Sequence, residues 1–178
     1  QGYKNFGIIS GPHDAIDAVF RKNGFIDHDP VTPARLREHE QKFSSLHGTV
    51  GIVALDNKAN IFAGTSTGGI GYETPGRVSD SPTVAGTYAS SKVGVSCTGI
   101  GEQIIQQATA AKIVTRVEDG MTLNRAVSKT VEESNYFNYS FGLISLDSYG
   151  QIKIGKTEAL DEVFYAYRNG EEIETFYK

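Results

Sequence analysis

The sequence predicts an α+β fold, with strands first, a block of helices in the middle and strands again at the end. Short apolar runs bounded by turn residues indicate the strands, and longer segments with helical spacing indicate the helices. Because the helical segments stand together, we expect them to be layered on sheet rather than to alternate with strands. At 178 residues with 39% hydrophobic side chains, the chain is long enough for one domain with a buried core.

The composition changes at about residue 48, and two helices are expected before that point. Residues 14–20 place apolar side chains at helical spacing. A second, highly charged helix is predicted through about Phe43, with Thr32 as its N-cap and Pro33 in its first turn. Its polarity indicates a solvated linker rather than a core element.

The segment after residue 48 reads as strands joined by turns. Residues 50–55 and 61–66 are apolar runs on either side of an Asp-Asn-Lys turn, which predicts a hairpin. Residues 68–82 are dense in Gly, Pro, Ser and Asp and are expected to form a loop. Residues 93–97 predict a third strand.

Two helices and three further strands complete the predicted order. Residues 102–117 and 122–133 each carry an apolar stripe at helical spacing. Strands are predicted at residues 140–146, 151–154 and 163–168, where apolar and β-branched side chains return.

Charge and cysteine content exclude several classes of protein. The chain has 17 Lys and Arg against 21 Asp and Glu, whereas a nucleic-acid-binding module normally carries a basic stripe. No apolar run is long enough to span a membrane. The single cysteine, Cys97, excludes an internal disulfide framework and a cysteine-based zinc site, and we expect it to be a buried strand residue. We therefore predict a cytoplasmic protein that binds neither nucleic acid nor membrane.

Gly48 and Thr49 stand where the polar front meets the first strand after it. On one interpretation the β-branched threonine simply begins that strand. On the other, a cut before Thr49 gives this residue a free α-amine beside its hydroxyl nucleophile. Such an amine has a pKa of roughly 7.7–8.0 and acts as a base near neutral pH. Composition alone leaves both interpretations open.

Arg77 and Asp80 place a guanidinium and a carboxylate three residues apart in the glycine-rich loop. One interpretation is a surface ion pair worth about 0–1 kcal/mol. The other is a clamp for a zwitterion, in which Arg77 binds a ligand carboxylate and Asp80 accepts hydrogen bonds from the ligand ammonium group. An amino-acid-like ligand requires both charges at such a spacing.

Two glycine-containing turns are candidate anion sites. Residues 65–69, Thr-Ser-Thr-Gly-Gly, place hydroxyl and backbone N–H groups at a strand end, although such clusters are mostly ordinary turns. Residues 98–102, Thr-Gly-Ile-Gly-Glu, join a strand to a helix, and we interpret them as hydrogen-bond donors to an oxyanion. They lack the third glycine of a dinucleotide-binding turn. Residues 27–29, Asp-His-Asp, are interpreted as a solvated turn rather than a metal site.

The order of these motifs resembles the plant-type asparaginases and isoaspartyl peptidases, which are N-terminal-nucleophile hydrolases. Glycosylasparaginase and threonine aspartase are related to this group. Five segments carry the resemblance, which continues more loosely to the C-terminus: residues 48–56, 63–69, 75–82, 85–89 and 96–102.

In that family a precursor cleaves itself before a threonine, which then becomes the N-terminal nucleophile. The resemblance implies cleavage between Gly48 and Thr49. Residues 1–48 would then be the C-terminal part of an α-subunit and its linker, and residues 49–178 the β-subunit. It also implies an αββα sandwich, incomplete here because the N-terminal part of the α-subunit is absent.

The resemblance further implies the catalytic roles. Thr49 attacks the side-chain amide or β-peptide carbonyl, and its own α-amine takes the proton. Thr67 hydrogen-bonds the hydroxyl and amine of Thr49. The Thr98 hydroxyl and the Gly99 N–H group form the oxyanion hole. The implied reaction passes through an acyl-enzyme and releases aspartate from L-asparagine or from a β-aspartyl dipeptide.

The resemblance also assigns the substrate contacts. Arg77 holds the substrate α-carboxylate, Asp80 holds the α-ammonium group, and the Gly101 carbonyl helps to hold that ammonium. This assignment agrees with the clamp interpretation reached from the charges alone. Ser79 departs from the pattern, because the family usually has glycine there, and Cys97 replaces a frequent threonine.

The front of the chain departs most from the family. Gln1 is not an initiator methionine, so we expect a processed or cut N-terminus. The family's longer α-subunit supplies core strands, helices and a sodium-binding loop, and we therefore expect no metal or other cofactor in this chain. The chain is then a fragment, a piece whose partner is elsewhere, or a shortened homologue. The expected partners are the remainder of the α-subunit and further αβ units in a homo-oligomer, which would cover exposed sheet edges.

Two alternative functions remain at this point. A glycosylasparaginase-type hydrolase is favoured by the Ala-Gly-Thr run at residues 63–65. A catalytically degenerate family member that serves as a binding or assembly module is favoured by the short front.

Overall fold

The computed structural model describes residues 6–10, 48–69, 77–169 and 172–177, with only the backbone course for 6–10, 169 and 172–177. Along the chain, strands come first, a single block of helices follows, and further strands come after the helices. The elements in chain order are β1 (Phe6–Ser10), β2 (Thr49–Leu55), β3 (Ile61–Thr67), β4 (Thr87–Ala89), β5 (Val93–Gly99), α3 (Gly101–Gln107), α4 (Thr109–Glu118), α5 (Leu123–Tyr136), β6 (Phe141–Asp147), β7 (Ile152–Lys156), β8 (Phe164–Asn169) and β9 (Glu172–Tyr177).

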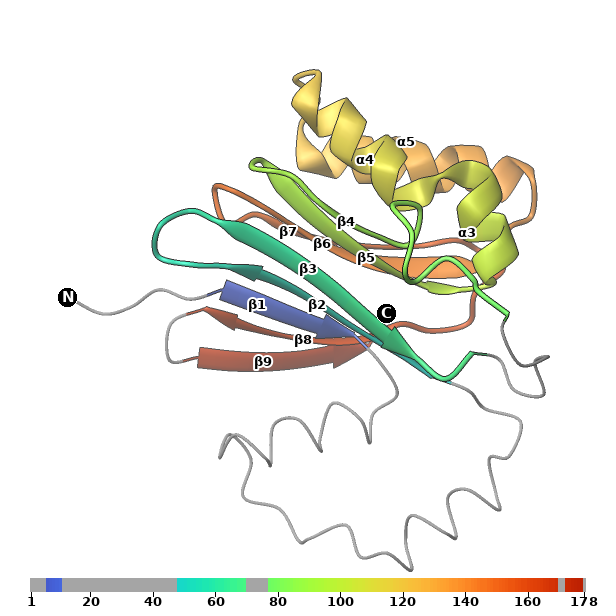
Figure 1. Ribbon diagram of the computed structural model, residues 1–178, viewed down its shortest axis with the longest axis horizontal. Helices are drawn as coiled ribbons and strands as arrows, with labels where there is room; N and C mark the ends of the chain where they lie inside the picture. The colour runs from blue at the N-terminus through green and yellow to red at the C-terminus, as the bar shows by residue number, and fades with distance from the viewer. Residues whose placement is uncertain (1–5, 11–47, 70–76, 170–171, 178) are drawn as a thin grey trace, which may run out of the picture.

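Two antiparallel sheets pack face to face, and the helices cover the outer face of one of them (Figure 1). One sheet has the strand order β3-β2-β1-β8-β9, and the other has the order β4-β5-β6-β7. Helices α4 and α5 pack on the second sheet, through β5, β6 and β7. The α+β class predicted from the sequence is therefore confirmed, as is the hairpin of β2 and β3.

Strand β6 shows why the layers hold together, because all of its residues are buried. Side chains alternate between the two faces of a strand. Phe141 and Leu143 contribute to the core under the helices, whereas Ile144 and Leu146 contribute to the core between the sheets. Burial on both faces explains the nearly continuous apolar run from which this strand was predicted.

The helices agree with the prediction in one case and correct it in another. Thr122 caps α5, since its hydroxyl accepts a hydrogen bond from the Arg125 N–H group. The single helix predicted at residues 102–117 is wrong, because the chain breaks at Ala108 into α3 and α4. Ala108 has a φ of 49°, in the left-handed region. The Ala110 N–H group bonds the Ala85 carbonyl, so a contact with the neighbouring loop fixes where α4 begins.

Some elements were not predicted, and some predictions fall outside the described part. Strands β1, β4 and β9 were missed. The helices predicted at residues 14–20 and from Thr32 to Phe43, and the Asp-His-Asp turn at residues 27–29, lie outside the residues that the structure describes.

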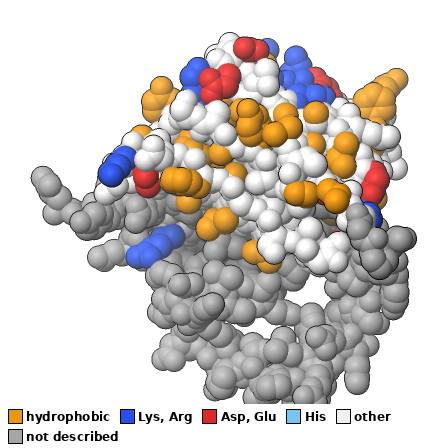
Figure 2. Space-filling view, viewed as in Figure 1, with side chains coloured by type: hydrophobic (Ala, Val, Ile, Leu, Met, Phe, Trp, Pro, Cys, Tyr) orange, Lys and Arg blue, Asp and Glu red, His pale blue; other side chains and the backbone are white. Residues whose placement is uncertain are grey.

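The described surface carries no single apolar patch on the face shown in Figure 2. Charged side chains gather over the helices, and hydrophobic side chains are spread among polar ones below them. The most exposed large hydrophobic side chains include Tyr136 and Tyr149, which lie at the end of α5 and in the β6–β7 turn.

Candidate active site

A cavity of about 240 Å³ opens where β2 begins and β3 and β5 end. Every residue predicted for catalysis or substrate binding lines it. The full lining is Thr49, Thr67, Gly69, Arg77, Ser79, Asp80, Thr98, Gly99, Ile100, Gly101, Ser140 and Leu160. Residues from both sheets and from two loops therefore meet in one place, although they are separated by more than a hundred positions in the chain.

The hairpin register brings two threonine hydroxyls together. Thr49, the first residue of β2, pairs with Thr67, the last residue of β3. The Thr49 hydroxyl donates to the Thr67 hydroxyl over 3.2 Å, and the Gly69 N–H group donates to the same Thr67 oxygen over 3.0 Å. Thr67 thus accepts two hydrogen bonds and keeps its own proton for a further contact. Within the run 65–69, residues 65–67 are the end of β3, and the Gly69 N–H group closes the following bend onto Thr67.

Asp80 is a buried carboxylate whose two oxygens differ. Its side chain is only 5% exposed. Oδ1 accepts a hydrogen bond from the Ser79 hydroxyl over 3.2 Å, whereas Oδ2 has no hydrogen-bond partner among the described residues. A Cβ atom on Gly86 would lie 2.4 Å from Oδ2, so the Asp80 side chain can take this position only because residue 86 is glycine.

Burial raises the pKa of Asp80 above its ordinary value of 3.8. The bond from Ser79 and the charge of Arg77 lower this pKa, and the charge of Glu102 raises it. Burial is the largest of these effects, so the pKa is raised overall. A carboxylate that lacks a partner at one oxygen and is desolvated is stabilised by an incoming cation. This side of the cavity therefore suits a positively charged ligand group.

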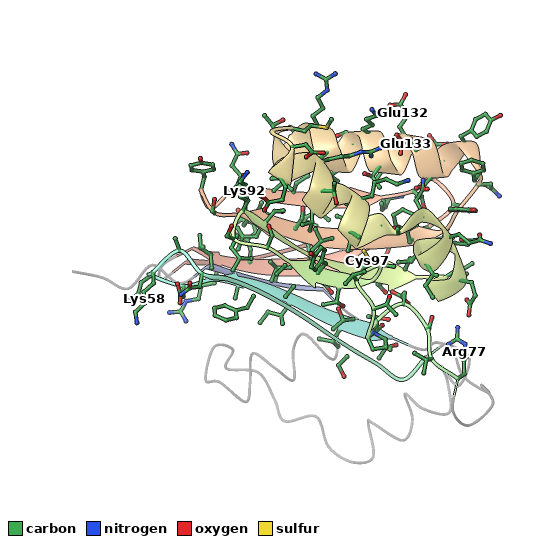
Figure 3. All side chains as sticks on the ribbon, turned by 45° about the horizontal axis from the view of Figure 1, so that its top comes forward. Lys58, Arg77, Lys92, Cys97, Glu132 and Glu133 are labelled. Carbon is green, nitrogen blue, oxygen red and sulfur yellow. The ribbon has the colours of Figure 1, made fainter. Side chains whose placement is uncertain are left out.

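Arg77 supplies the positive charge of the cavity. Its guanidinium forms an ion pair with Glu102 at 2.5 Å and donates to the Ser79 hydroxyl over 3.4 Å. The Arg77 side chain is 24% exposed and Glu102 is 59% exposed. Figure 3 shows Arg77 in the loop at the end of the sheets, far from Lys58 and Lys92. Arg77 and Asp80 therefore bring opposite charges to the cavity from positions three residues apart in the chain.

The turn after β5 depends on two glycines. Gly99 has a φ of 130°, and a Cβ atom there would lie 2.6 Å from the Cα atom of Phe141. A Cβ atom on Gly101 would lie 1.7 Å from the Ser79 hydroxyl oxygen and 2.6 Å from Asp80 Oδ1. At Gly101 the backbone therefore approaches Ser79 and Asp80 closely, which is possible because glycine has no side chain.

Sequence reasoning did not find every lining residue. Ser140 and Leu160 belong to the cavity but stand in later segments with no local motif. The Arg77–Glu102 ion pair was also missed, although Glu102 closes the run 98–102. Cys97 is buried, as predicted, and burial raises the pKa of its thiol well above the ordinary value, so the thiol stays protonated.

Metal and membrane features are absent from the part of the chain that the structure describes. Within residues 48–69 and 77–168, no three His, Cys, Asp or Glu side chains gather as a metal site would require. In the same described part, none of the helices has the length and apolarity needed to cross a bilayer.

Comparison with known proteins places the chain among asparaginase sequences. The sequence profile of a family described as asparaginase matches residues 18–177. The chain is 48% identical over 126 residues to an isoaspartyl peptidase/L-asparaginase of a Nostoc species, covering 71% of this chain and 39% of that protein. It is 54% identical over 110 residues to a Synechocystis protein of the same name, covering 62% of this chain and 33% of that protein.

A third relative extends the match over more of the chain. An isoaspartyl peptidase of Escherichia coli is 44% identical over 172 residues, which covers 86% of this chain and 51% of that protein. The chain thus spans about half or less of the length of these three relatives. Because the family profile covers most of its residues, the chain belongs to the asparaginase family.

Proposed function

We propose that this chain is the catalytic part of an amidohydrolase that hydrolyses L-asparagine and β-aspartyl dipeptides after cutting itself before Thr49. The observation that carries the proposal is the hydrogen bond between the Thr49 and Thr67 hydroxyls at a cavity that also contains Arg77 and Asp80. Membership in the asparaginase family and the names of its relatives support the same chemistry. The catalytic and binding roles below belong to this proposal.

Maturation requires one peptide bond to break. The Thr49 hydroxyl attacks the carbonyl carbon of Gly48, and the amide nitrogen leaves as the α-amine of Thr49, which gives an ester. Water then hydrolyses the ester, so that Gly48 ends in a carboxylate and Thr49 recovers its hydroxyl. The flanking glycine leaves the carbonyl unhindered.

Substrate hydrolysis repeats this chemistry on a ligand. The Thr49 α-amine takes the hydroxyl proton while the oxygen attacks the side-chain amide carbon of the substrate. The proton passes to the leaving ammonia or amine, and an acyl-enzyme remains. Water then releases aspartate and restores the hydroxyl. Thr67 orients the nucleophile, to which it is already hydrogen-bonded.

The negative charge on the carbonyl oxygen needs donors at the end of β5. We assign this role to the Thr98 hydroxyl and the Gly99 N–H group, which line the cavity. Preorganised donors of this kind stabilise a developing oxyanion strongly because they need no rearrangement.

The charged loop holds the rest of the substrate. Arg77 binds the α-carboxylate, while Asp80 and the Gly101 carbonyl bind the α-ammonium group. The buried carboxylate of Asp80 favours this direction of binding, because an ammonium group beside it would offset the cost of burying its charge.

The proposal extends to the architecture and assembly. The described layers, helix on sheet on sheet, become an αββα sandwich when further helices cover the outer face of the β1-containing sheet. The rest of an α-subunit would supply that layer, since residues 6–10 already form β1 within the sheet. The complete units would associate into a homo-oligomer.

The decisive experiment compares the protein with its Thr49→Ala variant. N-terminal sequencing and mass spectrometry after incubation should identify a piece that begins at Thr49 in the parent protein only. Ammonia release from L-asparagine should fall by a factor on the order of 10⁴ or more in the variant. Ser128→Ala, which removes an exposed hydroxyl on α5, is the control and should change neither result.

Other outcomes would redirect the assignment. Ammonia release by Thr49→Ala at the parental rate would exclude Thr49 as the nucleophile. Hydrolysis of glycosylated asparagine without hydrolysis of β-aspartyl dipeptides would contradict the proposed substrates. An uncut Gly48–Thr49 bond together with no turnover would contradict the enzyme itself and favour a binding module.

A further inference from the structure

Ser79 stands between the two charged groups of the cavity and contacts both. Its hydroxyl donates to Asp80 Oδ1 over 3.2 Å and accepts from the Arg77 guanidinium over 3.4 Å. It also lines the cavity itself. The hydroxyl is therefore placed inside the binding space and not only behind it.

The same hydroxyl lies against Gly101. A Cβ atom built on Gly101 would come within 1.7 Å of the Ser79 oxygen, so the oxygen occupies the space that a side chain at 101 would fill. Asp80 Oδ1 is 2.6 Å from the same point. The Ser79 hydroxyl, Asp80 Oδ1 and the backbone of Gly101 thus lie close together.

The hydrogen-bonding capacity at this point is not exhausted. A serine hydroxyl has one proton and two acceptor positions. In Ser79 the proton is directed to Asp80, and one acceptor position takes the long bond from Arg77. Among the described residues, one acceptor position of Ser79 is left without a donor, and it lies beside Oδ1 of the Asp80 carboxylate.

We propose that Ser79 is a substrate-binding residue, whose hydroxyl is the third acceptor for a primary ammonium group held by Asp80 and Gly101. This inference rests on the proposed function, because it concerns the amino group of the same substrate. A primary ammonium has three N–H donors, and three acceptors around it satisfy all of them. Ligands that lack the ammonium group, or carry an acyl group on that nitrogen, cannot offset the charge of the buried Asp80 carboxylate or donate to the remaining acceptor position of Ser79.

The test combines two variants with two substrates. Succinamic acid is L-asparagine without the α-amino group, so it retains the reacting amide and the carboxylate. In Ser79→Ala, KM for L-asparagine should rise about tenfold with kcat preserved, because one hydrogen bond to a charged group is lost. KM for succinamic acid should change less than twofold. Ser79→Gly should give the same pattern and provides a second protein if the alanine variant folds poorly.

A binding measurement makes the test independent of turnover. Calorimetry with L-aspartate and with succinate should show a tenfold loss of affinity for L-aspartate in both variants and no loss for succinate. Ser128→Ala serves again as the control. A parent protein that binds L-aspartate but releases no ammonia would overturn the proposed hydrolase and still test Ser79.

Three results would overturn the role of Ser79. An equal change with both ligands would show that the serine only maintains the loop. Unchanged affinity for both would show that it does not touch the ligand. Tighter binding of L-aspartate after its removal would show that the hydroxyl is an obstacle rather than an acceptor.

Discussion

Asp80 is a buried carboxylate that lines the cavity. Its carboxylate is almost fully buried, its Oδ2 atom lacks a described partner, and glycine at position 86 makes room for it. Burying an ionised carboxylate in this way disfavours its charged form, which is why its pKa is raised. A cation beside the carboxylate offsets this cost, so Asp80 suits the binding of an ammonium group.

Ligand binding should therefore depend on pH through Asp80. Its pKa is raised above 3.8, so affinity for L-aspartate should be lost as the pH falls through that raised value. The bond from Ser79 lowers this pKa, and its removal in Ser79→Ala should move the midpoint to higher pH. Calorimetric titration from about pH 3.5, near the ordinary value, to about pH 7 measures both midpoints.

The ligand's own carboxyl groups titrate equally with both proteins, so the difference between the two midpoints reports on the protein. Arg77 and Glu102 are the other charged groups that face Asp80, and both are unchanged in the comparison. Coincident midpoints would mean that Ser79 does not tune this carboxylate.

Individual site residues were predictable where the sequence carries a chemical pattern. Arg77 and Asp80 are opposite charges at short spacing, and their joint lining of the cavity follows the clamp interpretation. Thr49 was one of two open interpretations of the residues alone, the role of Thr67 came from the family resemblance, and the contact between them follows from hairpin register. Ser140 and Leu160 could not be predicted, because only the closing of the two sheets brings them to the cavity.

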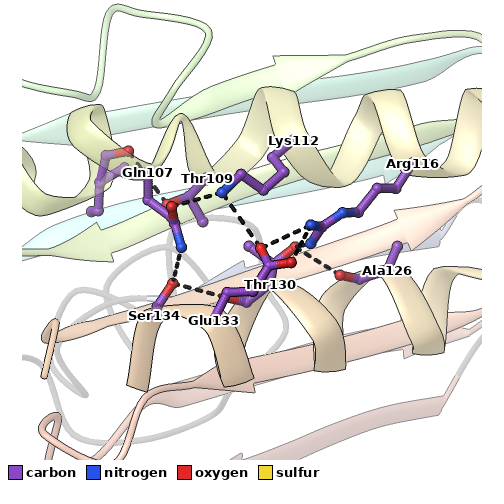
Figure 4. Close-up of polar contacts among 9 residues, drawn as sticks. Gln107, Thr109, Lys112, Arg116, Ala126, Thr130, Glu133 and Ser134 are labelled. Atoms are coloured by element: carbon purple, nitrogen blue, oxygen red, sulfur yellow. Dashed lines mark hydrogen bonds and ion pairs between the residues drawn. The ribbon is translucent and has the colours of Figure 1, made fainter. Parts of the chain in front are cut away.

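Helices α4 and α5 are joined by a polar network that the sequence pattern did not reveal (Figure 4). Arg116 donates to both carboxylate oxygens of Glu133, over 2.6 and 2.8 Å, and to the Thr130 hydroxyl over 2.6 Å. Lys112 lies 3.5 Å from the same carboxylate. Two cations on α4 therefore share one anion on α5.

This network should contribute a pH-dependent part of stability. Hydrogen bonding from Arg116 holds the pKa of Glu133 below its ordinary value of 4.5. A depressed carboxyl pKa stabilises the fold above the unfolded value, and this stabilisation is lost as the pH falls through the folded value. Glu133→Gln should lower the free energy of unfolding by about 1 kcal/mol at pH 7, because the pair is partly exposed.

The difference should vanish in strong acid, where Glu133 is protonated in both states. Urea unfolding at several pH values checks this, with Glu132→Gln as the control. Glu132 is the adjacent, exposed carboxylate, and Figure 3 shows both residues on α5. A constant difference at every pH would assign the effect to packing instead of charge.

The elements that the sequence predicted are those with long or clean patterns. β6 is apolar on both faces, and α5 combines a cap with an apolar stripe. β4 has three residues and carries too little pattern to be recognised. The break at Ala108 contains neither glycine nor proline, and it coincides with the Ala110 N–H bond to the Ala85 carbonyl and with the Thr109 hydroxyl bond to the Ile104 carbonyl. Local propensity was overridden there by contact with another segment.

At the scale of the whole molecule, the candidate site depends on the distance between the two sheets. Thr49 stands on β2 in one sheet, and Thr98 stands on β5 in the other. The two sheets approach closely at Gly94 of β5, where a Cβ atom would lie 2.6 Å from a Val53 methyl on β2 and 2.8 Å from an Ile61 methyl on β3. The glycine thus permits the separation at which Thr49 and Thr98 line one cavity.

Gly94→Ala should therefore lower both stability and activity. The added methyl overpacks the core between the sheets, which costs about 1–3 kcal/mol, and it pushes β2 away from β5. Gly155→Ala is the matched control, because its Cβ atom would press on Val127 of α5 at 2.8 Å, on the helix side of the second sheet. Both variants should lose similar stability in thermal unfolding, whereas only Gly94→Ala should lose turnover well below its melting temperature. Equal turnover in the two folded variants would show that the site tolerates a change in sheet spacing.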